Sequence, residues 1–220
     1  MEILLAHAPA LLSGALYTLA VFAATATLSL LIAVPLAVLY EFGPRPARAV
    51  VATFSWTMRA APTLVLLFFA YYALPALGIF LEPIPSAILA LTASGAGYNL
   101  TFIAAGLRAV PREQFAAARA LGIPRLRMYR RIIFPQALRV ALPPLMSNLT
   151  LMLKGTSLAA LVSVPELTAE AYSVVSLTYR PFEVLGAAAV MYILLNSMLV
   201  GVQYLMEQRL DIPDTAPHRR

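Results

Sequence analysis

The amino-acid sequence predicts an all-α membrane protein with five transmembrane helices and one charged loop between the third and the fourth. The 220 residues are 61% hydrophobic and 12% charged, with a mean hydropathy of +0.81, which is far too apolar for an ordinary soluble domain. The only long hydrophilic run, Arg112–Pro135, separates segments that are apolar enough to cross a bilayer. We therefore expect a single transmembrane domain over residues 1–220.

Each expected span contains about 20 apolar residues, the number needed to cross about 30 Å of hydrocarbon. The spans are predicted at residues 14–40, 55–80, 85–107, 140–163 and 184–207. An interfacial piece is expected before the first, and the start of the chain lacks the basic residues of a cleavable signal peptide. Pro62 can kink the second span, and only Lys154 interrupts the fourth.

Basic residues fall unevenly between these spans, which predicts the orientation. The amino end and Leu74–Ser86 have none and Ser163–Glu183 has only Arg180, whereas loop 108–139 is rich in arginine. Further arginines lie after span one and in the tail, namely Arg45, Arg48, Arg209, Arg219 and Arg220. Because basic residues mark cytoplasmic loops, we expect the amino terminus outside, and the carboxyl terminus and loop 108–139 in the cytoplasm. The net charge of +6 thus indicates topology rather than nucleic-acid binding.

Loop 108–139 is predicted to contain two short helices. The first, Glu113–Leu121, is rich in alanine, and Gly122 can end it in the left-handed conformation. The second is expected over Arg125–Phe134, until Pro135 stops it. Because such short helices are marginal in water, the alanine face predicts a partner packed over it. The alternative is a helix on the membrane surface, with its arginines among the headgroups.

Polar side chains recur at helical spacing in two spans and indicate a candidate path. Span three carries Ser94, Tyr98 and Thr101, and span four carries Ser147, Thr150, Lys154 and Ser157. The alternative for each hydroxyl is a hydrogen bond to the preceding turn or to a neighbouring helix.

Two cations in or beside the spans have both a functional and a structural interpretation. An intramembrane ammonium costs about 3 kcal/mol unless it is paired or hydrated, so Lys154 is a candidate, although it can also snorkel. Lys154–Ser157 also allows the helix to loosen, which is tolerated only where protein or water surrounds the backbone. Arg59 either anchors span two at the headgroups or reaches into a polar cavity.

The sequence contains few residues that could serve in catalysis or bind a nucleotide. Histidine occurs only at His7 and His218, cysteine is absent, and no phosphate-binding Gly-x-x-x-x-Gly-Lys-Ser/Thr loop is present. Glu166 and Glu170 fall in an expected outside loop, where we predict that they are solvated. We therefore expect no catalytic residue, metal or cofactor in this chain, and a dependence on other chains for energy. A stand-alone ion-coupled carrier, or a structural subunit that transports nothing, stays as an alternative.

The charged loop resembles the cytoplasmic Glu-Ala-Ala motif of the permease subunits of bacterial ATP-binding-cassette (ABC) importers. In that motif alanines are followed by three residues, a glycine, nine residues and Ile-x-Leu-Pro. Here the motif reads Ala117-Ala118, Gly122 and Ile132-Ile133-Phe134-Pro135, with the spacing kept. Three further stretches resemble the polar amino-acid branch of the family: Gly14 with Thr18-Leu19, Arg59-x-x-Pro62-Thr63-Leu64 with Phe68-Phe69, and Pro135-Gln136-Ala137 with Lys154-Gly155-Thr156-Ser157-Leu158.

The resemblance implies a permease of the bacterial inner membrane that translocates a polar amino acid of the histidine, glutamine or glutamate type. Its implied partners are two ATPase subunits that hold Mg-ATP, a second permease, identical or homologous, and an extracytoplasmic binding protein. The residues implied in coupling to the ATPases are Glu113, Ala116, Ala117, Ala118, Arg119, Gly122 and Arg125. The hypothetical substrate path comprises Arg59, Tyr98, Thr101, Lys154, Thr156 and Ser157.

The chain departs from the family pattern at five positions that concern the loop motif and the spans. Ala116 stands where the motif has its glutamate, and Glu113 lies one turn earlier, where glycine is usual. The common Tyr-x-Ala-Glu-x-x-Arg of span three has Thr101 for its acid and Ala104 for its base, and a usual glutamine of span two is Leu66. The amino acid carried and the pairing of permeases are therefore open.

Overall fold

A computed structural model describes residues 2–210, and every regular element in that range is helical. The expected tail residues Arg219 and Arg220, and His218, lie outside the described residues. Four helices are long and apolar enough to cross a membrane: Ile3–Phe42, Pro83–Ala109, Arg125–Val162 and Pro181–Arg209. A fifth span results if the bent pair Arg45–Ala60 and Thr63–Leu77 is counted as one. The predicted all-α membrane fold is confirmed.

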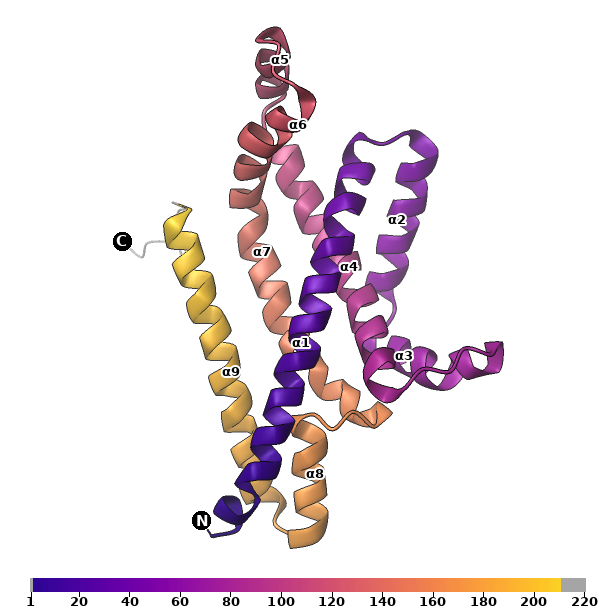
Figure 1. The fold of residues 1–220 in the computed structure, drawn as a ribbon, viewed down its shortest axis with the longest axis vertical. Coiled ribbons are helices and arrows are strands. Elements are labelled where there is room, and N and C mark those ends of the chain that lie inside the picture. Colours follow the sequence, from indigo (N-terminus) through magenta and orange to yellow (C-terminus); the bar gives the residue numbers. More distant parts are fainter. Residues whose placement is uncertain (1, 211–220) are drawn as a thin grey trace.

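The long helices form an elongated bundle (Figure 1). Helix α1 (Glu2–Phe42) packs along α4 (Pro83–Ala109), and α4 packs on α7 (Phe134–Gly155). Helix α9 (Pro181–Arg209) lies at one side of this trio, and α2 (Arg45–Ala60) with α3 (Thr63–Phe68) lies at the other (Figure 1). The short α5 (Arg112–Ala120) and α8 (Leu167–Thr178) occupy opposite ends of the bundle (Figure 1).

Helix α1 is longer than the first predicted span. It runs without a break through Pro9 and Pro35, so the expected separate interfacial piece before residue 14 is part of the same helix. The leucine and alanine that dominate this stretch are strong helix formers, and they carry the helix through both prolines.

The second predicted span, 55–80, is not a straight helix. Helix α2 ends at Ala60, and the chain bends by 103° before Thr63–Leu77, where α3 continues as a π segment and a 3₁₀ turn. Ala61 is extended, with ψ 131°, because the ring of Pro62 disfavours the helical conformation of the residue before it. The kink expected at Pro62 is therefore a full break.

The second short helix of the loop does not stop at Pro135. Helix α6 (Arg125–Met128) passes through a π segment, Tyr129–Ile133, directly into α7. Pro135 occupies the first turn of α7, where the hydrogen-bond register has already changed, so its missing N–H does not end the helix. The result is one helical rod over Arg125–Val162, whose last part, from Thr156, is a 3₁₀ helix.

Helix α8 was not predicted, and it corrects the expectation for Glu166. This side chain is fully buried and caps α8, since its carboxylate accepts a hydrogen bond from the N–H of Ala169 at 2.9 Å. The hydroxyl of Tyr192 on α9 donates to the same carboxylate at 2.5 Å, and that of Thr18 on α1 lies 3.4 Å from it. Glu166 thus joins three helices instead of facing solvent.

The start of α8 is seated on a glycine of α1. A Cβ at Gly14 would come within 2.8 Å of the Leu167 Cα and 2.9 Å of the Glu170 Cγ. The N–H of Leu167 donates to the Thr18 hydroxyl at 3.1 Å. Gly14 and Thr18, one turn apart, therefore hold the amino end of α8.

Burial raises the pKa of Glu166, although hydrogen bonds from Thr168, Tyr192 and Ala169 oppose that shift. Because the pKa is higher in the folded chain, the folded state binds this proton more tightly than the unfolded state does. The contribution of Glu166 to stability must then fall as pH rises from the ordinary carboxyl pKa through the raised value. We expect the melting temperature of the detergent-solubilised protein to fall as the pH rises above the ordinary glutamate pKa of about 4.3, and to fall less in Glu166→Gln.

The matched control is Glu170→Gln, a partly exposed acid on the same helix. It is expected to keep the pH dependence of the wild type. Identical slopes in wild type and Glu166→Gln would contradict this prediction.

Candidate functional site

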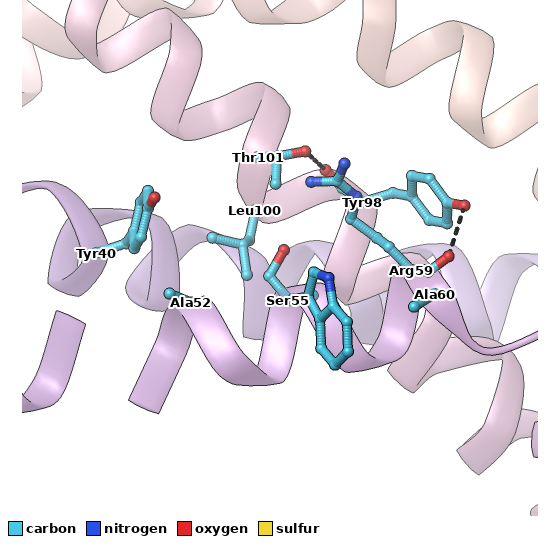
Figure 2. A pocket seen from close by; sticks show the side chains of 9 residues that line it. Tyr40, Ala52, Ser55, Arg59, Ala60, Tyr98, Leu100 and Thr101 are labelled. Atoms are coloured by element: carbon cyan, nitrogen blue, oxygen red, sulfur yellow. Dashed lines mark hydrogen bonds between the residues drawn. The ribbon is translucent and has the colours of Figure 1, made fainter. Parts of the chain in front are cut away.

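A cavity lined by both polar and apolar side chains opens beside the break between α2 and α3 (Figure 2). We call it the Arg59 cavity; its volume is 430 Å³, and it is lined by Tyr40, Ala52, Ser55, Trp56, Arg59, Ala60, Tyr98, Leu100 and Thr101. Three of the six predicted path residues, Arg59, Tyr98 and Thr101, therefore meet in one place. These residues come together because α2 packs on α4, where the Ser55 hydroxyl donates to the Gly97 carbonyl.

Arg59 is held by the ring and the hydroxyl of Tyr98. Its guanidinium carbon lies 5.7 Å from the ring centroid, and the Tyr98 hydroxyl donates to the Arg59 carbonyl at 3.3 Å. The Thr101 hydroxyl donates to the Tyr98 carbonyl at 2.7 Å (Figure 2). Within residues 2–210 the ion pairs are Arg108–Glu41 and Arg180–Glu183, so no described carboxylate neutralises Arg59.

A second cavity, which we call the Asn148 cavity, lies on the other side of Tyr98. Its volume is 470 Å³, and the lining residues that matter most here are Thr63, Ser94, Tyr98, Ser147, Asn148 and Gly155. Tyr98 lines both cavities. The predicted stripe of span three, Ser94 with Tyr98 and Thr101, is thus divided between two adjoining spaces.

A chain of buried amides behind the Asn148 cavity links three helices. The Asn148 Nδ2 on α7 donates to the Asn99 Oδ1 on α4 at 2.8 Å, and the Asn99 Nδ2 donates to the Ser29 Oγ on α1 at 3.0 Å. Asn148 was not among the predicted site residues. The signal was present, since two asparagines inside apolar spans need buried partners, but the pairing itself depends on the packing.

The other three predicted path residues lie at the end of α7. Lys154 is exposed in its last turn, and Thr156 is buried. The hydroxyls of Thr156 and Ser157 donate to the carbonyls of Leu153 and Lys154, at 2.7 and 2.8 Å. None of the three lines either cavity, but Gly155 between them lines the Asn148 cavity.

Helix α5 agrees with the predicted first loop helix to within one residue at each end. Gly122 follows it with φ +66°, the left-handed conformation expected from the sequence. Ala116, Ala117 and Ala120 are exposed, whereas Ala118 is only 2% exposed and belongs to the core.

The remaining predicted coupling residues surround this alanine face. Glu113, Arg119 and Arg125 are all exposed. Arg119 and Arg125 line, with Arg112, a cavity of 470 Å³ under α5.

An aromatic cluster fixes α5 on the bundle. The ring of Phe115 lies 5.9 Å from that of Phe42 on α1 and 6.3 Å from that of Tyr129 in the π segment, measured between centroids. The Phe42 and Tyr129 rings also meet edge to face at 5.6 Å. Such contacts add to the burial of apolar area, so α5 has a defined position although it is only nine residues long.

Comparison with known proteins places these features in a family. Residues 29–212 match the family model of the binding-protein-dependent transport system inner membrane component. The chain is 31% identical to the L-cystine transport system permease protein TcyB of Bacillus subtilis (strain 168), over 92% of this chain and 87% of that protein. It is 33% identical to the histidine/lysine/arginine/ornithine transport system permease protein HisM of Salmonella typhimurium, over 90% of this chain and 88% of that protein.

Solved structures agree with this assignment. The chain superposes on a chain in a crystal structure of an amino acid ABC transporter with histidines, with a TM-score of 0.85, 28% identity and coverage of 94% of this chain and 96% of that one. An inward-facing MetNI methionine ABC transporter shares the fold, with a TM-score of 0.77 at 20% identity. The resemblance of the charged loop to ABC importer permeases is confirmed, and the chain belongs to the family of inner-membrane components of binding-protein-dependent transport systems.

Proposed function

We propose that this chain is the permease subunit of an ATP-driven importer and moves a polar amino acid delivered by an extracytoplasmic binding protein. The observation that carries the proposal is α5, a helix with exposed alanines that is fixed at one end of a membrane bundle and closed by a left-handed glycine. The names of the relatives, which concern cystine and the basic amino acids, support an amino acid as the substrate.

In this proposal α5 is the coupling helix, which docks on an ATPase subunit. The small side chains of Ala116 and Ala117 allow close approach, and Glu113, Arg119 and Arg125 supply polar contacts at the edges. Ala118 seats the helix on its own bundle instead of touching the partner. Glu113 takes the place of the motif glutamate that Ala116 lacks.

The substrate path runs along Tyr98, through the Arg59 cavity and the Asn148 cavity. Lys154, Thr156 and Ser157, beside Gly155, belong to the mouth of the path at the end of α7. The hydroxyls and carbonyls there are local hydrogen-bond partners that a polar substrate can exchange for its own.

The α5 end of the bundle faces the cytoplasm in this proposal, and the amino terminus lies outside. The complete importer contains two such permeases, identical or homologous, and two ATPases in the bacterial inner membrane. Mg-ATP is bound and hydrolysed by the ATPases, so this chain itself is not an enzyme.

The proposal is tested by purifying the tagged chain from its native membrane with its bound subunits and reconstituting the complex in proteoliposomes. We expect an ATPase to co-purify and labelled amino-acid uptake to require both ATP and the binding protein. Uptake by this chain alone, driven by a proton or sodium gradient, would instead establish a secondary carrier. An intact complex that carries no amino acid under either condition would establish a structural subunit.

A further inference from the structure

We propose that the Arg59 cavity is a binding site for amino acids that carry no net positive charge, with Arg59 holding the substrate carboxylate. The proposal rests on the proposed function and names the substrate class of that path.

Arg59 is the one charged side chain among the described residues that line the cavity. It lies at the end of α2, directly before the 103° break within the second candidate span. An ionisable residue at such a break in a membrane segment faces a polar pathway or pairs with a partner, and Arg59 is exposed. Because the described chain gives Arg59 no carboxylate partner, an incoming carboxylate is its natural complement.

The guanidinium is partly positioned before a substrate arrives. It lies over the Tyr98 ring, and Figure 2 shows it extending across α4 towards Thr101. The arginine fork matches a carboxylate with two parallel hydrogen bonds, and its order on the aromatic ring lowers the entropy lost on binding.

The neighbouring hydroxyls can accept hydrogen bonds from an ammonium group. The Ser55 hydroxyl already donates to the Gly97 carbonyl at 2.9 Å, and the Thr101 hydroxyl donates to the Tyr98 carbonyl. Their protons are used, so their oxygen lone pairs remain for a donor. The cavity therefore offers one cation for a carboxylate and neutral acceptors for an α-ammonium.

A second positive charge finds no complement in this cavity. The side chain of lysine or arginine would bring a cation next to Arg59, where none of the described lining residues is acidic. Two like charges at close range repel each other, and no carboxylate among the described lining residues offsets that repulsion. The positive charge of Arg59 thus makes the cavity discriminate against cationic amino acids, whereas neutral and acidic amino acids fit.

The chain contains its own reporter for this site, because its single tryptophan, Trp56, lines the cavity. Trp56 fluorescence of the purified full-length protein in detergent would be titrated with glutamine, glutamate and lysine. We expect saturable responses to glutamine and glutamate, and at least tenfold weaker binding of lysine. Arg59→Gln should weaken glutamate binding at least tenfold, and Thr101→Glu should make lysine binding stronger than in the wild type.

The matched control is Arg48→Gln, which removes an exposed arginine of the same helix outside the cavity and should leave the titrations unchanged. If Arg59→Gln does not fold, Arg59→Lys serves, since it keeps the charge without the fork and should bind glutamate several-fold more weakly. Equal responses to lysine and glutamine, an unaffected Arg59→Gln, or no saturable response to any of the three amino acids would overturn the proposal. The titration requires no ATPase, so its failure is distinguishable from loss of ATP-driven uptake.

Discussion

Replacing Gly122 by valine is expected to reduce ATP-driven uptake at least roughly tenfold while the protein still inserts into the membrane. Gly122 has φ +66°, a conformation that costs an L-residue about 1–2 kcal/mol and a β-branched one more. A Cβ at this position would meet nothing within 4 Å. The strain is therefore confined to the backbone that ends α5, and relaxation of that strain reorients the alanine face.

Uptake would be measured in proteoliposomes that contain the complete complex, and ATPase retention would be measured by co-purification. Gly201→Val is the control, because a Cβ there also meets open space but the backbone is helical. We expect the control to retain both uptake and bound ATPase. If Gly122→Val transported normally with its ATPase bound, α5 would not be the coupling helix.

The same substitution at two neighbouring alanines of α5 is expected to affect different properties, namely uptake at Ala117 and stability at Ala118. Ala117 is exposed, so Ala117→Leu should leave the thermal stability unchanged but block close docking of an ATPase, with an uptake loss of roughly tenfold or more. Ala118 is only 2% exposed in the core formed with Leu107 and Ile133. Ala118→Leu should therefore destabilise the protein by about 1–3 kcal/mol through overpacking.

The two variants separate docking from folding when melting temperature and ATPase co-purification are measured on the same samples. Ala117→Leu is expected to lose the ATPase at an unchanged melting temperature. Ala118→Leu is expected to melt earlier. Loss of stability in both variants, with the ATPase retained by Ala117→Leu, would place the partner on another surface.

The features that the sequence predicted correctly are those set by local chemistry. Gly122 adopts the left-handed conformation because glycine does so at little cost. Pro124, two residues later, prevents the helix from continuing. The bounds of α5 and of span three follow from apolar length and from prolines at the helix starts. Arg59, Tyr98 and Thr101 were singled out because polar groups in apolar segments need partners. The three residues line one cavity, and their role in a substrate path stays a prediction.

The features that escaped prediction depend on residues far apart in the chain. Glu166 can be buried because Thr18 and Tyr192 supply hydrogen bonds to its carboxylate. Thr18 lies 148 residues earlier and Tyr192 lies 26 residues later, so no local sequence pattern predicts these bonds. Asn148 finds Asn99 only once α7 lies on α4. The passage of the helix through Pro135 depends on a π segment, which cannot be distinguished from a helix end by composition.

The uninterrupted rod over Arg125–Val162 has a mechanical consequence. Its 38 residues correspond to a length of roughly 55 Å, with the π segment beside α5 at one end and Gly155 near the other. A tilt of about 5° about one end therefore displaces the opposite end by about 5 Å over that length. If α5 is the coupling helix, as proposed, the rod acts as a lever: a slight rotation at the π segment becomes a displacement near Gly155 that is comparable to the width of a small amino acid.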